Sequence, residues 1–261
     1  MQLFSAVVSI ILAGYIGWEV VKFGPRYRQL KQELRNGDPR ARTRVYKRAL
    51  VFEWISALLA LVALRFDWSK LNPAFLDLNG TPWLQPLLNR SAFNNGAMTG
   101  ALAGVAIGTV GMIIVRLKAN RKGTAPIAAG PAPWWRKLMP DFFALVPATM
   151  QERMLWAAVA ISAGICEEIV FRGWLLTTLH TSLGLNGTAL LLAGAVMFGL
   201  AHSYQGITGM VVTGLAGAFF CGLYVATGSL LVPILLHAAV DVRFAIMPAP
   251  FNQKQQAAYS H

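Results

Sequence analysis

The segment GICEEIVFRG, residues 164–173, places two adjacent carboxylates and an arginine inside the apolar run 153–179. That run is long enough to cross a bilayer, because a spanning helix needs about 20 predominantly apolar residues. Ionisable side chains at bilayer depth are costly, so Glu167, Glu168 and Arg172 are not expected there by default. The segment therefore predicts a membrane helix that carries a functional site.

The composition of the whole chain agrees with a membrane location. Of its 261 residues, 56% are hydrophobic and only 13% are charged, whereas soluble domains carry about 25% charged residues. The formal net charge is +12, but most basic residues gather in two segments between apolar runs, as the positive-inside bias predicts. We therefore predict an all-α, polytopic integral membrane helix bundle, with the lipid bilayer and not nucleic acid as its partner.

Apolar runs of about spanning length recur along the chain. They predict about seven transmembrane helices, near residues 3–23, 49–65, 97–117, 153–179, 187–204, 207–227 and 229–247. The first run has no basic segment before it and no obvious small-residue cleavage site, so we expect it to be retained as an anchor.

Charge and proline content divide the chain into three parts. Residues 1–140 are expected to hold amino-terminal transmembrane helices, a basic cytoplasmic loop and a proline-rich linker, residues 141–250 the catalytic helix core, and residues 251–261 a carboxyl-terminal tail. The densest basic segment, 26–48, should be cytoplasmic. A second basic segment, 118–137, fits the same side two crossings later, which places the amino terminus outside and the carboxyl terminus in the cytoplasm.

The carboxylates of the opening segment are expected to differ in role. Glu168 and Arg172 are four residues apart with the acid on the amino-terminal side, so an ion pair along one helix face is expected. Glu167 is turned about 100° away on a helix. It is thus left available as the general base.

Two further pairs of residues place polar groups in the later spans. Phe198 and His202 end the fifth predicted span, and His237 and Asp241 lie in the seventh, each pair at a spacing of four that shares one helix face. A single histidine at a span end is more often an interfacial residue than a catalyst. The convergence of all these groups at similar depth favours a catalytic cavity, open toward the cytoplasm, over a packing role.

Both cysteines lie in apolar runs, and there is no C-x-x-C pair. The simplest interpretation of Cys166 and Cys221 is that they are small buried hydrophobic residues. Because Cys166 precedes Glu167, it is also a candidate for the wall of the same cavity.

The motifs Glu167-Glu168-x-x-x-Arg172, Phe198-x-x-x-His202 and His237-x-x-x-Asp241 occur in this order on predicted membrane helices. Together they resemble the CAAX prenyl endopeptidase and bacteriocin-processing (CPBP) family of glutamate-type intramembrane proteases. The resemblance covers residues 153–247. It implies an endopeptidase that cleaves a peptide bond near the carboxyl terminus or membrane segment of a membrane-associated protein.

The resemblance also implies a role for each motif. Glu167 and His202 would activate a water molecule, and His237 and Asp241 would stabilise the oxyanion, while Glu168, Arg172 and Phe198 would orient them. Members related to the eukaryotic enzyme usually carry asparagine at the position of Asp241. An ionised aspartate would repel an oxyanion, so Asp241 must be protonated, must orient His237, or must bind a metal.

Three alternatives stay open at this point. No cofactor is expected, but Glu167, His202, His237 and Asp241 form a donor set that zinc accepts, which allows a zinc-dependent variant of the same protease. A non-catalytic membrane scaffold or bacteriocin self-immunity protein is the alternative from another class, and a proton-coupled transporter is the third. In each case we expect an integral protein of a bacterial plasma membrane.

Overall fold

The structure is a computed structural model, and it describes residues 2–72 and 142–246 together with isolated positions between 100 and 114. All regular secondary structure in these residues is helical, which confirms the all-α fold class. The predicted span at 97–117 lies largely outside the described residues. The linker at 123–140 and the tail at 251–261 lie outside them entirely.

The helices follow the predicted apolar runs. Their bounds are α1 (Gln2–Arg35), α2 (Ala41–Ala63), α7 (Met150–Glu168), the π-helix η6 (Ile169–Leu175), α8 (Leu176–Leu183), α9 (Gly187–Ala201), α10 (Gly206–Thr227) and α11 (Leu231–Val242). Short 3-10 helices are η1 (Trp68–Leu71), η5 (Phe142–Leu145), η7 (Ser203–Gln205) and η8 (Arg243–Ile246).

Three of the described helical stretches are long and apolar enough to cross a membrane. They are Leu3–Arg35, Met150–Leu183 and Ser203–Thr227, and Gly187–Ala201 is a shorter apolar helix. These stretches support an integral membrane protein. The predicted number of about seven spans is not confirmed.

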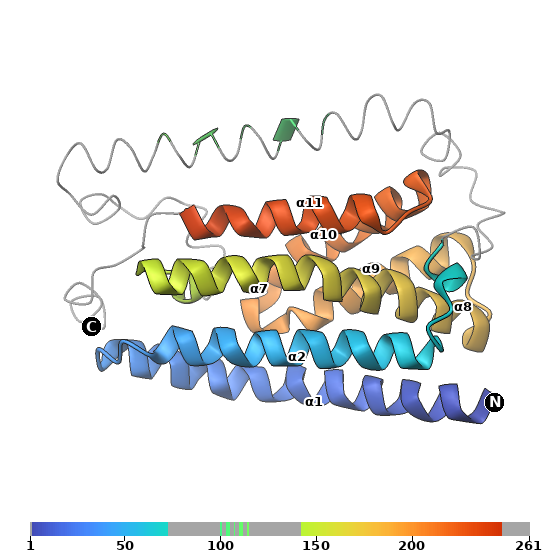
Figure 1. The fold of residues 1–261 in the computed structure, drawn as a ribbon, viewed down its shortest axis with the longest axis horizontal. Coiled ribbons are helices and arrows are strands. Elements are labelled where there is room, and N and C mark those ends of the chain that lie inside the picture. Colours follow the sequence, from blue (N-terminus) through green and yellow to red (C-terminus); the bar gives the residue numbers. More distant parts are fainter. Residues whose placement is uncertain are drawn as a thin grey trace.

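Helix α7 lies at the centre of the bundle (Figure 1). It packs against α2 on one side and against α11 on the other, and α1 lies along the far side of α2. Helices α9 and α10 pack on each other and complete the bundle. The helix that carries the Glu-Glu pair is therefore in contact with both the amino-terminal and the carboxyl-terminal helices.

Small residues on α7 allow this close packing. Ala160 and Gly164 are four residues apart and are buried on one face. A Cβ atom at Gly164 would lie 2.7 Å from the backbone nitrogen of Ala238 in α11. Only glycine allows α11 to approach this closely, and His237, the residue before Ala238, is thereby held beside the Glu-Glu pair.

The start of α7 is joined to α2 by a buried ion pair. Thr149 and Glu152 form a reciprocal capping box, in which the Thr149 hydroxyl accepts from the Glu152 N–H and the Glu152 carboxylate accepts from the Thr149 N–H. Arg42 of α2 lies 3.7 Å from the same carboxylate and donates to the carbonyl of Ala144 at 2.9 Å. Arg42 is therefore a packing residue and not only a topology signal.

The basic segment 26–48 is mostly helical, which differs from the expected loop. Helix α1 continues to Arg35 and α2 begins at Ala41. Arg44 of α2 pairs with Glu33 of α1 at 2.7 Å and with Asp38 of the connecting turn at 2.6 Å. The hydrogen bond from Arg44 also holds the pKa of Asp38 below its ordinary value. The cytoplasmic position of this segment stays a prediction.

We expect Gly164→Ala to destabilise the protein by about 1–3 kcal/mol, the usual effect of overpacking. The new methyl group would push on the backbone of α11, which is less able to move than a side chain. Thermal unfolding of the purified protein in detergent measures the effect. Gly14→Ala is the matched control, because no atom lies within 4 Å of a Cβ at Gly14, and an equal loss in both variants would contradict the close contact.

Candidate active site

The helix that carries the central motif changes its winding directly after the two carboxylates. Glu167 and Glu168 end α7, and the seven residues Ile169–Leu175 form a π-helix. A π-turn inside a helix widens it locally and occurs frequently at functional sites. Arg172 lies within this widened turn, and the arginine side chain is directed into the bundle, where it is 1% exposed.

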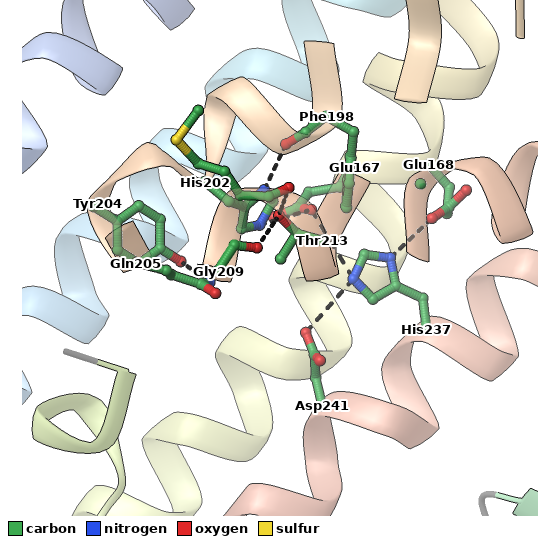
Figure 2. A network of polar contacts seen from close by, with 12 residues as sticks. Glu167, Glu168, Phe198, His202, Tyr204, Gln205, Gly209, Thr213, His237 and Asp241 are labelled. Atoms are coloured by element: carbon green, nitrogen blue, oxygen red, sulfur yellow. Dashed lines mark hydrogen bonds and ion pairs between the residues drawn. The ribbon is translucent and has the colours of Figure 1, made fainter. Parts of the chain in front are cut away.

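The carboxylate of Glu168 joins three helical elements. Its Oε1 accepts a hydrogen bond from Arg172 Nη1 at 3.0 Å and lies 2.8 Å from His237 Nδ1. Glu168 is 0% exposed. Figure 2 shows the His237 ring between Glu168 on one side and Asp241 on the other. Glu168 therefore forms the predicted ion pair with Arg172 and, in addition, holds the ring of His237.

The guanidinium of Arg172 is enclosed by aromatic rings. It lies 4.7 Å from the ring centroid of Phe198 and 5.4 Å from that of Phe220, and Nη2 donates to the carbonyl of Gly217 at 3.0 Å. Phe220 is also stacked on the His237 ring, with 5.0 Å between centroids. Phe198 and Phe220 thus pack against both ends of the Arg172–Glu168–His237 series.

Glu167 faces away from this series and toward two histidines. Its Oε2 lies 3.9 Å from Nε2 of His202 and 3.9 Å from Nε2 of His237. Both distances are too long for a direct hydrogen bond. Oε2 is buried and has no hydrogen-bond partner. The structure therefore separates the two glutamates as the sequence predicts, with Glu168 paired and Glu167 free.

His202 is the C-cap of α9, and its ring orientation is set by the backbone of that helix. Nδ1 lies 2.8 Å from the carbonyl oxygen of Phe198. Because a carbonyl oxygen only accepts, Nδ1 carries the proton in this contact and Nε2 is the nitrogen that faces Glu167. The Phe198 ring lies 4.7 Å from the His202 ring and packs against it.

Asp241 lies on the other side of the His237 ring. Its Oδ2 is 3.5 Å from His237 Nε2, and its side chain is 31% exposed. Its backbone oxygen accepts a hydrogen bond from the indole of Trp156 at 2.9 Å, which ties this turn of α11 to α7. Since Glu168 already holds Nδ1, Asp241 approaches the same nitrogen of His237 that Glu167 faces.

A cavity lies beside Glu167 and is walled by α1, α2, α7, η6 and residues from 201 to 204. The space between its walls, including the side that is open to solvent, is about 1090 Å³. Cys166 and His202 are among its wall residues, so Cys166 lines the cavity as predicted. Both cysteines are buried and unpaired.

Several polar residues of the cavity wall are absent from the sequence motifs, and two of them are buried on α2. Glu53 and Ser56 lie on α2 and line the same cavity as Glu167. Glu53 is a carboxylate inside the predicted span 49–65, so the argument that singles out Glu167 applies to it equally. The sequence places Glu53 in an apolar run, but no second polar motif lies nearby, so the pattern alone does not indicate a site there.

The described residues contain no group of three or more histidine, cysteine, aspartate or glutamate side chains arranged to hold a metal ion. Zinc binds its nitrogen and oxygen ligands at about 2.0–2.2 Å in a tetrahedral arrangement. The donor set Glu167, His202, His237 and Asp241 is brought together but does not have that arrangement.

Comparison with known families adds an independent observation to this geometry. Residues 149–243 match a family model described as Type II CAAX prenyl endopeptidase Rce1-like. The match supports the resemblance of this part of the chain to CAAX-type proteases. Comparisons with curated proteins and with solved structures each gave no match.

The Rce1-like segment agrees with the part of the chain that carries the motifs. It begins at the Thr149 cap of α7 and ends directly after α11, so it includes Glu167, His202, His237 and Asp241. The Rce1-like family is a protease family, which supports a hydrolase embedded in a membrane. Helices α1 and α2, with Glu53 and Ser56, lie outside the match.

We expect Glu168→Gln and Arg172→Ala each to lower stability by about 3–5 kcal/mol, because the first leaves the buried Arg172 guanidinium without its carboxylate and the second leaves the buried Glu168 with His237 alone. The melting temperature of the purified variants measures this. Glu33→Gln is the matched control, since Glu33 is a partly exposed glutamate that also pairs with an arginine. Normal melting temperatures for both buried-site variants would contradict the orienting role of the pair.

Proposed function

We propose that the protein is an intramembrane endopeptidase of the CAAX type that cleaves a membrane-associated protein near its carboxyl terminus or membrane segment. The observation that carries the proposal is the position of Glu167 Oε2, which is unpaired, faces a cavity and lies 3.9 Å from Nε2 of both histidines. A water molecule between these three groups would be within hydrogen-bond reach of each of them. The Rce1-like match supports the reaction class.

In the proposed mechanism Glu167 acts as the general base. It takes one proton from a water molecule that His202 Nε2 helps to orient, and the water oxygen attacks the peptide carbonyl carbon. As the tetrahedral intermediate collapses, the carbon–nitrogen bond breaks and Glu167 returns the proton to the leaving amine. The products are a new carboxylate and a new amino terminus.

His237 supplies the oxyanion contact in this mechanism. With Nδ1 directed to Glu168, the protonated ring presents Nε2–H toward Glu167, beside which the negative charge would develop. Asp241, 3.5 Å from Nε2, stabilises the imidazolium from the side and does not contact the oxyanion itself. In this arrangement Asp241 acts on His237, so an aspartate is compatible with a position at which direct contact would repel the oxyanion.

The same proposal includes a location. We place the protein in a bacterial plasma membrane with its amino terminus outside, its carboxyl terminus in the cytoplasm and about seven spans. The basic residues at the end of α1 and the start of α2 support a cytoplasmic position for that end of the bundle.

We expect Glu167→Gln to reduce cleavage by about 10²–10⁴-fold, the usual contribution of a general base. The assay uses the purified protein in liposomes with an internally quenched, prenylated CAAX peptide, alongside a comparison of carboxyl termini in membrane proteomes of wild-type and Glu167→Gln cells. Glu33→Gln serves as the control and should cleave normally. Full activity of Glu167→Gln would show that the base is misassigned, and the absence of any cleaved protein would favour a non-catalytic role.

We expect the active protein to contain no stoichiometric metal ion. Elemental analysis of the purified protein, with activity before and after chelation, tests this. A stoichiometric ion that is lost together with activity in His202→Ala would establish the zinc-dependent alternative instead.

A further inference from the structure

Helix α2 contributes two unpaired polar side chains to the wall of the cavity. Glu53 is 7% exposed and Ser56 is 4% exposed, so both are more than nine-tenths buried. Glu53 Oε2 and Ser56 Oγ have no hydrogen-bond partner. They are three residues apart and therefore lie on the same face of α2, and both line the cavity that contains Glu167.

The distribution of unpaired atoms in the bundle points to this cavity. The buried side-chain atoms without a partner in the described residues are Glu53 Oε2, Ser56 Oγ, Glu167 Oε2, Glu168 Oε2 and Arg172 Nε. The last two belong to side chains whose other atoms are bonded to each other and to neighbours. The first three all line one cavity.

Leaving such groups unpaired is costly unless something else binds them. A buried polar group without a partner costs about 1–3 kcal/mol. Leucine at position 53 and alanine at position 56 of α2 would fill similar space without this cost. Glu53 lines the same cavity as the carboxylate of Glu167, and a second buried carboxyl group there adds to the cost of burial.

The chemistry of the two groups matches a peptide backbone. A peptide bond that enters an apolar cavity brings an N–H donor and a C=O acceptor, and both must be paired there. A carboxyl oxygen accepts from an N–H and a hydroxyl donates to a carbonyl. The neighbouring wall residues Phe52, Val170 and Phe171 offer no side-chain partner of this kind.

We infer that Glu53 and Ser56 form a subsite for the main chain of the substrate peptide, with Glu53 accepting from a backbone N–H and Ser56 donating to a backbone carbonyl. The inference rests on the proposed peptidase function and adds a binding role for α2, which lies outside the Rce1-like segment. In this arrangement α2 holds the peptide while α7, α9 and α11 supply the groups that act on it.

Binding is measured in the Glu167→Gln protein, so that cleavage does not interfere. The probe is the internally quenched, prenylated CAAX peptide in detergent micelles. We expect Glu53→Leu and Ser56→Ala each to weaken binding about tenfold, which corresponds to one lost hydrogen bond to a buried group. Ser9→Ala is the control, because Ser9 accepts from Trp174 and is not among the cavity residues.

Stability separates a binding role from a packing role. If Glu53 and Ser56 are left unpaired for the sake of a ligand, Glu53→Leu and Ser56→Ala should melt at the same or a higher temperature than the parent protein. If they serve packing, both should melt lower. A lower melting temperature together with unchanged peptide affinity would overturn the inference.

The partner on the peptide is identified by replacing its amides one at a time with esters, which removes a single N–H. One replacement should weaken binding to the parent protein but not to Glu53→Leu. Losses that add independently at every position would overturn the assignment to Glu53.

Kinetics in the active protein distinguish the subsite from a second acid–base group. Glu53→Gln keeps an acceptor oxygen, so its KM and kcat should stay close to those of wild type, whereas Glu53→Leu should raise KM with little change in kcat. A large loss of kcat in Glu53→Gln at unchanged affinity would contradict the subsite and leave the peptidase proposal intact. The absence of cleavage by the wild-type protein would instead count against the proposed function.

Discussion

The buried carboxylate of Glu168 is the interaction on which the site depends. One oxygen serves both Arg172 and His237, and through Arg172 the contact extends to the backbone of α10. Inside an apolar bundle these charges are stable only because each has a partner in place. The pairing fixes the position of α11 relative to η6, and with it the nitrogen of His237 that faces Glu167. The orientation of the reacting groups is therefore a consequence of a structural ion pair.

The local part of this arrangement could be predicted from the sequence. The spacing of Glu168 and Arg172 predicts their ion pair, and the helical angle between adjacent residues separates Glu167 from it. The contact between Glu168 and His237 could not be predicted in this way, because it joins residues 69 positions apart. It depends on how closely α11 packs against Gly164. The π-helix of η6 has no known signature in the sequence, so regular helical spacing was expected there.

Other features that the sequence does not predict also depend on contacts that form only in the folded chain. The basic residues between the first two spans indicate an extramembrane segment by composition alone, and composition does not reveal that Arg42 is buried against Glu152 or that Arg44 joins α1 to α2. Ion pairs of this kind depend on partners that are brought close by the fold. Glu53 was accessible to the same argument as Glu167, but a single acid in an apolar run carries little weight until a cavity is seen beside it.

The site has one part in which the polar groups are paired with each other and another in which they are not. In the Arg172–Glu168–His237 series, the atoms that face one another are paired, which makes the series rigid. Across the cavity, Glu53, Ser56 and Glu167 each present a buried oxygen without a partner, which lowers stability in the absence of a ligand. A membrane peptidase needs both, because a peptide entering an apolar site loses its hydrogen bonds to water and must find replacements there. Under the proposed function, the unpaired oxygens lie where a substrate peptide would bind, and the paired ones hold the proposed catalytic groups in place.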